Sequence, residues 1–136
     1  MGNAKESIFK ISSDKIRAKD LFEMSQERLN VVIAVIPKSL GYKILEEYYE
    51  VAVQLITAIM YTDGYKTLSH ISLIQYLKKY DEFERVDLEL LDNMRKFRHR
   101  TVYYGRKESG NFLINHELEI KHIVKKLASV AKGKIF

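Results

Sequence analysis

The stretch from residue 42 to residue 63 limits the fold of this chain more than any other segment. Its spacing predicts a long helix that is apolar on nearly every side: Leu45, Tyr48, Tyr49, Val51, Ala52, Val53, Leu55, Ile56, Ile59 and Met60. Only a narrow polar stripe, which includes Glu46, Glu50 and Gln54, interrupts it. Such a helix has to be covered by other elements on several sides. The segment therefore predicts a layered helical bundle with this helix at its centre.

The remaining periodic segments also have helical spacing. We predict helices from Ser13 or Asp14 to Ile36, over 71–80 after a Ser69 cap, over 86–105, and from an Asn115 cap to about residue 131. Pro37 ends the first of them, because the residue before a proline avoids helical angles. Nothing indicates a convincing strand. The expected fold is all-α, an up-down bundle of about five helices over 13–136, preceded by a flexible arm at 1–12.

Composition excludes several classes of protein. The chain has 136 residues and no cysteine, so it has neither a disulfide framework nor a cysteine-based zinc site. Its longest apolar run, 31–36, is too short to cross a bilayer, and residues 1–13 lack the apolar core of a signal peptide. We therefore expect a cytoplasmic protein with no membrane partner.

The basic excess of the chain is concentrated after residue 94. Six of the 23 basic residues lie there within thirteen positions that contain no acid: Arg95, Lys96, Arg98, Arg100, Arg106 and Lys107. Without them the chain would hold 17 basic and 18 acidic residues in place of its net charge of +5. Like charges three or four residues apart repel on a helix, so something negative is expected to neutralise them.

Two interpretations of this cluster stay open. The arginines pair with acids of the central helix, for which Glu46, Glu47 and Glu50 are the candidates, or they bind an external anion. In the second case Arg95, Arg98 and Arg100 are the expected contacts for RNA or a nucleotide. Tyr103 follows them on the outer face of the helix, where a phenol ring stacks on a base or donates to a phosphate.

Other chemistries find little support. The chain has no glycine-rich phosphate loop, which excludes the common nucleotide-binding folds. Its four histidines, His70, His99, His116 and His122, do not have the spacing of a metal site. We expect neither a metal nor a cofactor.

Several short motifs, taken in order, resemble the HEPN family (higher eukaryotes and prokaryotes nucleotide-binding). They are Tyr48-Tyr49-x-x-Ala52, Gly64-Tyr65, Ser69-His70, and Leu91-x-x-x-Arg95-x-x-Arg98-His99 ending in Tyr103-Tyr104-Gly105. The resemblance covers nearly the whole chain. It implies a helical bundle, commonly a homodimer, that is paired with a minimal nucleotidyltransferase in toxin–antitoxin systems. In many members it also implies metal-independent RNA cleavage.

The catalytic signature implied by this resemblance is incomplete. The family has an Arg, then a polar residue, then a His four to six positions after the Arg; Arg98 and His99 match the first two. Tyr103 stands where the last His is expected. The candidate catalytic residues are thus Arg98, His99 and Tyr103, with weak or absent cleavage expected. The alternative is a non-catalytic dimeric helical interaction module.

A homodimer is also expected from the residues themselves. The central helix is apolar nearly all round. The next-to-last helix has a predicted core stripe, with Leu91 and Val102 beside it, and the stripe consists of Leu90, Met94, Phe97, Thr101 and Tyr104. We expect one subunit to be too small to cover this much apolar surface, and large exposed apolar patches mark interfaces.

Overall fold

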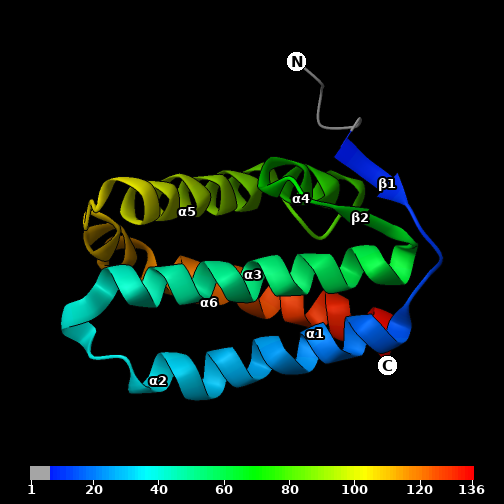
Figure 1. The fold of residues 1–136 in the computed structure, drawn as a ribbon, viewed down its shortest axis with the longest axis horizontal. Helices are drawn as coiled ribbons and strands as arrows, with labels where there is room; N and C mark the ends of the chain where they lie inside the picture. Colours follow the sequence, from blue (N-terminus) through cyan, green and yellow to red (C-terminus); the bar gives the residue numbers. More distant parts are fainter. Residues whose placement is uncertain (1–6) are drawn as a thin grey trace.

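The computed structural model describes residues 7–136, which form an all-α bundle (Figure 1). Its elements are β1 (Ile8–Lys10), α1 (Lys15–Glu27), α2 (Ile33–Val35), α3 (Gly41–Asp63), β2 (Tyr65–Thr67), α4 (His70–Tyr76), α5 (Arg85–Tyr104) and α6 (Ser109–Ile135). In Figure 1, α3 runs through the middle, with α1 below it, α4 and α5 above it and α6 behind it. It contacts all four of them. The predicted all-α class is confirmed.

The apolar surface of α3 is covered within one chain. Leu45, Leu55, Ile59 and Met60 are completely buried, and they pack against α1, α5 and α6. Leu91 of α5 is also completely buried. The expectation that one subunit cannot cover these residues is therefore wrong, because α6 packs along most of α3.

The first helical segment begins and ends as its sequence predicts. Asp14 caps α1 by accepting a hydrogen bond from the backbone N–H of Arg17 at 2.9 Å. Ile36 leaves the helix with ψ 125°, directly before Pro37. Between these ends the chain passes through a π-helical turn, Arg28–Val32, which no feature of the sequence predicts.

A small antiparallel sheet corrects the expectation that the chain has no strand and begins with a loose arm. Ile8 lies opposite Thr67 and Lys10 lies opposite Tyr65. Gly64 makes this pairing geometrically accessible, because its φ of +86° turns the chain sharply at the end of α3. Strands of three residues are too short to show an alternating pattern. Residues 1–6 of the predicted arm lie outside the described residues.

The last helix begins earlier than predicted. It starts at Ser109, although its backbone leaves helical angles at His116, directly after the predicted Asn115 cap. The polar segment before this kink belongs to the helix because it packs tightly. Phe112 stacks on Phe97 at 4.6 Å between ring centroids, and Gly110 packs against Gly41 at the start of α3, where a Cβ on Gly41 would lie 3.0 Å from the Gly110 Cα.

The core stripe of α5 is shorter than predicted. Met94 is fully buried, and Phe97 and Thr101 are half-buried. Tyr104, expected to be buried at the end of this stripe, is 70% exposed. The last inward contact is made by Thr101, whose hydroxyl lies 2.9 Å from that of Ser109, so Tyr104 extends beyond the core.

Candidate functional site

Arg98 lies at the junction of α5 and α3. Its Nη2 atom is 3.0 Å from Glu50 Oε1, and its guanidinium lies over the Tyr49 ring, 5.7 Å from the centroid. The side chain is only 25% exposed. Its buried Nε has no hydrogen-bond partner among the described residues. A buried donor without an acceptor is destabilising, and because this Nε is closed to solvent, an external acceptor reaches it only after neighbouring side chains move.

Arg95 lies one turn earlier on α5 and is also paired with an acid. Its Nε donates to Asp92 Oδ1 at 2.9 Å, and Lys96 Nζ lies 3.2 Å from the other oxygen of the same carboxylate. Burial alone would raise the pKa of Asp92, but the hydrogen bonds from these two cations outweigh it and lower that pKa. Asp92 therefore stays ionised at neutral pH.

His70 completes this group from a distant part of the chain. It is the first residue of α4, positioned by the Ser69 side chain, which accepts from the backbone N–H of Ser72. Its Nδ1 lies 2.9 Å from the hydroxyl of Tyr49. Burial and the positive charges of Arg98 and Arg95 lower the pKa of His70, although Glu50 opposes them. We call Tyr49, Glu50, His70, Arg95 and Arg98 together the Arg98 site.

His70 was not among the predicted site residues. It lies far from Arg98 in the sequence, and only tertiary packing of α4 against α3 and α5 brings it near. The one signal in the sequence was its place in the Ser69-His70 motif of the HEPN resemblance. The resemblance implies no chemical role for the two residues of that motif.

His99 and Tyr103 lie on the exposed side of α5. Their rings are 4.5 Å apart between centroids, and the His99 ring also meets Tyr104 edge-on at 5.9 Å. Arg98, by contrast, turns toward Glu50 and Tyr49 on α3. The three predicted catalytic residues therefore divide between a half-buried arginine and an exposed ring pair.

Arg100 lies apart from the other two predicted arginine contacts. Its guanidinium sits over the Phe97 ring at 5.0 Å, and it lines a shallow hollow of about 360 Å³ with Tyr104, Arg106 and Glu108. Arg100 follows Arg98 by two residues, and this spacing puts the two side chains on different faces of α5. An anion held by Arg98 and Arg95 is thus not also held by Arg100 in this arrangement.

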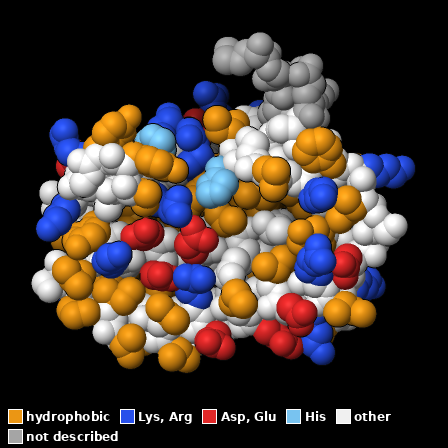
Figure 2. Space-filling model, in the orientation of Figure 1, with side chains coloured by type: hydrophobic (Ala, Val, Ile, Leu, Met, Phe, Trp, Pro, Cys, Tyr) orange, Lys and Arg blue, Asp and Glu red, His pale blue; other side chains and the backbone are white. Residues whose placement is uncertain are grey.

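Each of the three candidate acids has a different partner. Glu50 pairs with Arg98, Glu47 contacts Arg28 of the π-helical turn, and Glu46 lies 3.9 Å from Lys43. Figure 2 shows the result on this face, where acidic and basic side chains alternate over α3 and histidines lie beside them.

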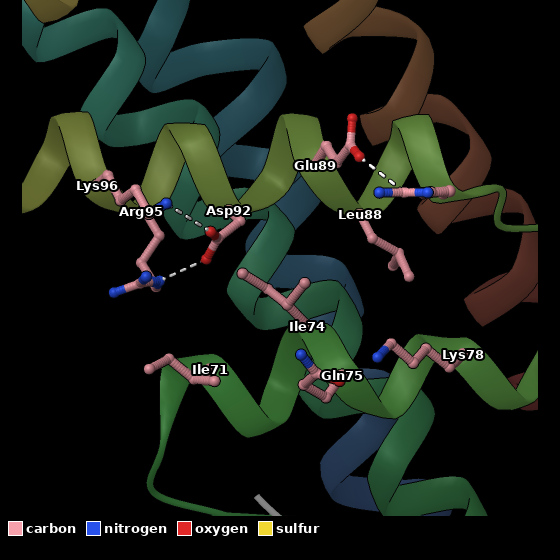
Figure 3. A pocket seen from close by; sticks show the side chains of 10 residues that line it. Ile71, Ile74, Gln75, Lys78, Leu88, Glu89, Asp92, Arg95 and Lys96 are labelled. Atoms are coloured by element: carbon pink, nitrogen blue, oxygen red, sulfur yellow. Dashed lines mark hydrogen bonds and ion pairs between the residues drawn. The ribbon is translucent and has the colours of Figure 1, made fainter.

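A groove of about 410 Å³ between α4 and α5 adjoins the Arg98 site (Figure 3). Ile71, Ile74 and Leu88 supply its apolar lining. Asp92 lies between Arg95 and Lys96 at one end, as the dashed lines in Figure 3 show. Arg95 therefore borders both the groove and the Arg98 site.

Comparison with known proteins found no matching family model, no matching curated protein and no matching solved structure. Within residues 7–136, no His, Asp and Glu side chains gather in a group of three suited to a metal ion. None of the helices in this part of the chain combines the length and the apolar character that crossing a bilayer requires.

Proposed function

We propose that this chain binds the phosphate groups of RNA or of a nucleotide at the Arg98 site. The observation that supports this most directly is the half-buried Arg98, whose Nε donor has no acceptor although its Nη2 is paired. A guanidinium binds phosphate side-on through a pair of N–H groups, so a phosphate has to displace Glu50 from Nη2 or bind the other N–H groups of Arg98. His70 and Arg95 lie next to it.

The HEPN resemblance extends this proposal to a biological role. The all-α bundle agrees with the fold that the resemblance implies. We therefore propose a toxin-like, homodimeric protein that is paired with a minimal nucleotidyltransferase. Ribonuclease activity is proposed to be weak or absent, because Tyr103 replaces the expected His and lies with His99 on the exposed side of α5.

Binding of a short single-stranded RNA at several salt concentrations tests the phosphate site. Arg98→Ala is expected to weaken binding about tenfold or more, because a hydrogen bond to a charged group is lost. It should also flatten the salt dependence by about one unit of slope for each phosphate contact removed. Arg98→Lys keeps the charge but not the paired donors, so its RNA affinity should fall between those of the wild type and Arg98→Ala.

Arg17→Ala is the matched control, because Arg17 lies on α1 and pairs locally with Asp14. Thermal unfolding has to accompany these titrations, since Arg98→Ala leaves half-buried Glu50 without its partner. A folded Arg98→Ala with unchanged affinity and unchanged salt slope would contradict the proposal.

The alternative function is a non-catalytic dimeric helical interaction module. The pairing of Arg98 with Glu50 and of Arg95 with Asp92 favours it, because these charges are already compensated within the chain. In that case Arg98→Ala lowers the unfolding temperature and has no effect on RNA binding. The titrations above therefore separate the two functions.

A further inference from the structure

We propose that His70 contacts the same phosphate group as Arg95 and Arg98, and that it takes up a proton when that phosphate binds. This inference rests on the proposed function and adds a residue and a proton linkage to the site.

The hydrogen bond to Tyr49 determines which nitrogen of His70 carries the proton. Tyr49 is buried, and burial raises the pKa of its phenol against the lowering effect of Arg95 and Arg98. The phenol is therefore protonated at neutral pH and donates to His70 Nδ1, 2.9 Å away. Neutral His70 then carries its own proton on Nε2. Its second nitrogen is a donor, as a phosphate oxygen requires.

The charges around His70 explain why it is neutral in the free protein. From α3 it faces Tyr49 and Glu50, and from α5 it faces Arg95 and Arg98, with Asp92 beside Arg95. Burial and the two guanidinium groups keep the pKa of His70 below its ordinary value. Among the described residues that shift the pKa of His70, only Glu50 favours the imidazolium.

The same charges explain why an anion brings a proton with it. Arg95 and Arg98 carry two positive charges, and their partners Asp92 and Glu50 carry two negative charges. Lys96, which also pairs with Asp92, leaves the cluster with one net positive charge. A sulfate dianion carries one negative charge more than this, so protonating His70 supplies the missing positive charge, and the anion in turn stabilises the imidazolium. Binding therefore strengthens as the pH falls toward the pKa of free His70, and levels off below it.

The test follows the His70 imidazole by NMR from pH 5 to pH 8 at constant ionic strength, with and without sulfate. Sulfate keeps its two negative charges over this range, so only the protein titrates. We expect sulfate to raise the pKa of His70 by about one unit, which corresponds to roughly tenfold tighter binding when His70 is protonated. The exposed His122 imidazole is the internal reference and should not respond.

Two variants locate the effect. In Arg98→Ala the sulfate-induced shift should disappear, and in His70→Gln sulfate binding should lose its pH dependence. His122→Gln, at an exposed histidine on α6, should behave as the wild type. If His70→Gln does not fold, the wild-type titration still decides the matter.

The outcomes separate this inference from the proposed function. Sulfate or RNA binding that depends on Arg98, with the pKa of His70 unmoved, overturns the inference and leaves the function. A sulfate-linked shift of His70 in a protein that does not bind RNA overturns the function and leaves the inference. An absence of any sulfate response at His70 also overturns the inference.

Discussion

At the scale of single residues, Asp63 shows how one carboxylate joins several elements. It is the last residue of α3 and accepts hydrogen bonds from the hydroxyls of Tyr76 and Tyr80. The Nζ atom of Lys134, on α6, lies 2.6 Å from Oδ1 of Asp63, and Lys79 Nζ lies 3.7 Å from Oδ2. Burial works to raise the pKa of Asp63, but the bonds from Lys134, Tyr76 and Tyr80 outweigh it and lower that pKa.

The first prediction concerns the stability that Asp63 supplies. Its pKa is lower in the folded chain, so its contribution is fully present above the unfolded value near 4 and is lost as the pH falls through the folded value. Asp63→Asn should cost about 1–3 kcal/mol at pH 7 and should flatten the loss of stability below pH 4. Urea unfolding from pH 2.5 to pH 7 measures both.

Asp81→Asn is the matched control for this prediction, because Asp81 is exposed in the connection before α5. It should change the unfolding free energy little at any pH. An acid-pH profile of Asp63→Asn that parallels the wild type would contradict the role assigned to the carboxylate.

The second prediction concerns Tyr103. Its phenol lies beside the His99 ring on the outer face of α5, and a phenol rarely accepts a proton at pH 7. Tyr103→His introduces a group that both accepts and donates protons near neutrality. We expect RNA cleavage to rise from a weak or absent level, by up to about a hundredfold. Cleavage of a mixed RNA is the assay.

The double variant Tyr103→His with Arg98→Ala should lose whatever cleavage Tyr103→His gains. A wild-type protein that is already a robust ribonuclease dependent on Arg98 would contradict this prediction. A folded Tyr103→His that binds RNA and stays inert would show that Arg98 is too far from the new imidazole, or is wrongly oriented.

The site was only partly predictable at this scale. Arg95 and Arg98 could be predicted, because the high density of basic residues in this one segment is visible in the sequence. His70 could not be found in that way, since its proximity arises from packing of α4. Tyr104 was misplaced because periodicity does not reveal where the neighbouring core ends.

At the scale of elements, caps and glycines decide the boundaries. Asp14, Ser69 and Pro37 act as their residue types predict, because each works through local backbone geometry. Gly110 does not act in this local way. The sequence around it has the composition of a loop, but Gly110 packs against Gly41 at the start of α3, where a Cβ on Gly41 would lie 3.0 Å from the Gly110 Cα. Such a role depends on a residue far away and is not visible locally.

The third prediction compares the two glycines that end α3 and α5. Gly64 and Gly105 have φ values of +86° and +65°, so alanine is strained at either position. A Cβ at Gly64 would lie 2.9 Å from the backbone oxygen of Ile11, whereas one at Gly105 meets nothing within 4 Å. Gly105→Ala should cost about 1–2 kcal/mol.

Gly64→Ala should cost about 2–3 kcal/mol, because it also disturbs the 2.8 Å hydrogen bond from Ile11 N–H to the Gly64 carbonyl. Urea unfolding of the two variants measures the difference. Equal losses of stability would mean that the strand β1 moves aside at little cost.

At the scale of the whole molecule, the apolar surface that is left exposed lies away from α3. Ile114 and Leu118 lie on either side of the kink of α6 at His116, and they are 74% and 83% exposed. Val102, Tyr103 and Tyr104 are exposed on the last turns of α5, which the Thr101–Ser109 contact ties to the start of α6. In Figure 1 this is the end of the bundle opposite the β1–β2 sheet.

The last prediction is that this end forms a homodimer interface. The original reason, an uncovered α3, does not hold, but side chains as exposed as Ile114 and Leu118 leave an apolar surface that a second copy can cover. Sedimentation at micromolar concentration should show a dimer, and Leu118→Glu should weaken it about tenfold or more by burying a charge at the contact. Ile16→Glu is the control, because Ile16 is 80% exposed at the start of α1, at the other end of the bundle in Figure 1, and should leave the dimer intact. An equal effect of both variants would place the interface elsewhere. A wild-type monomer would mean that there is no interface, and the proposed RNA site would then have to be complete within one chain.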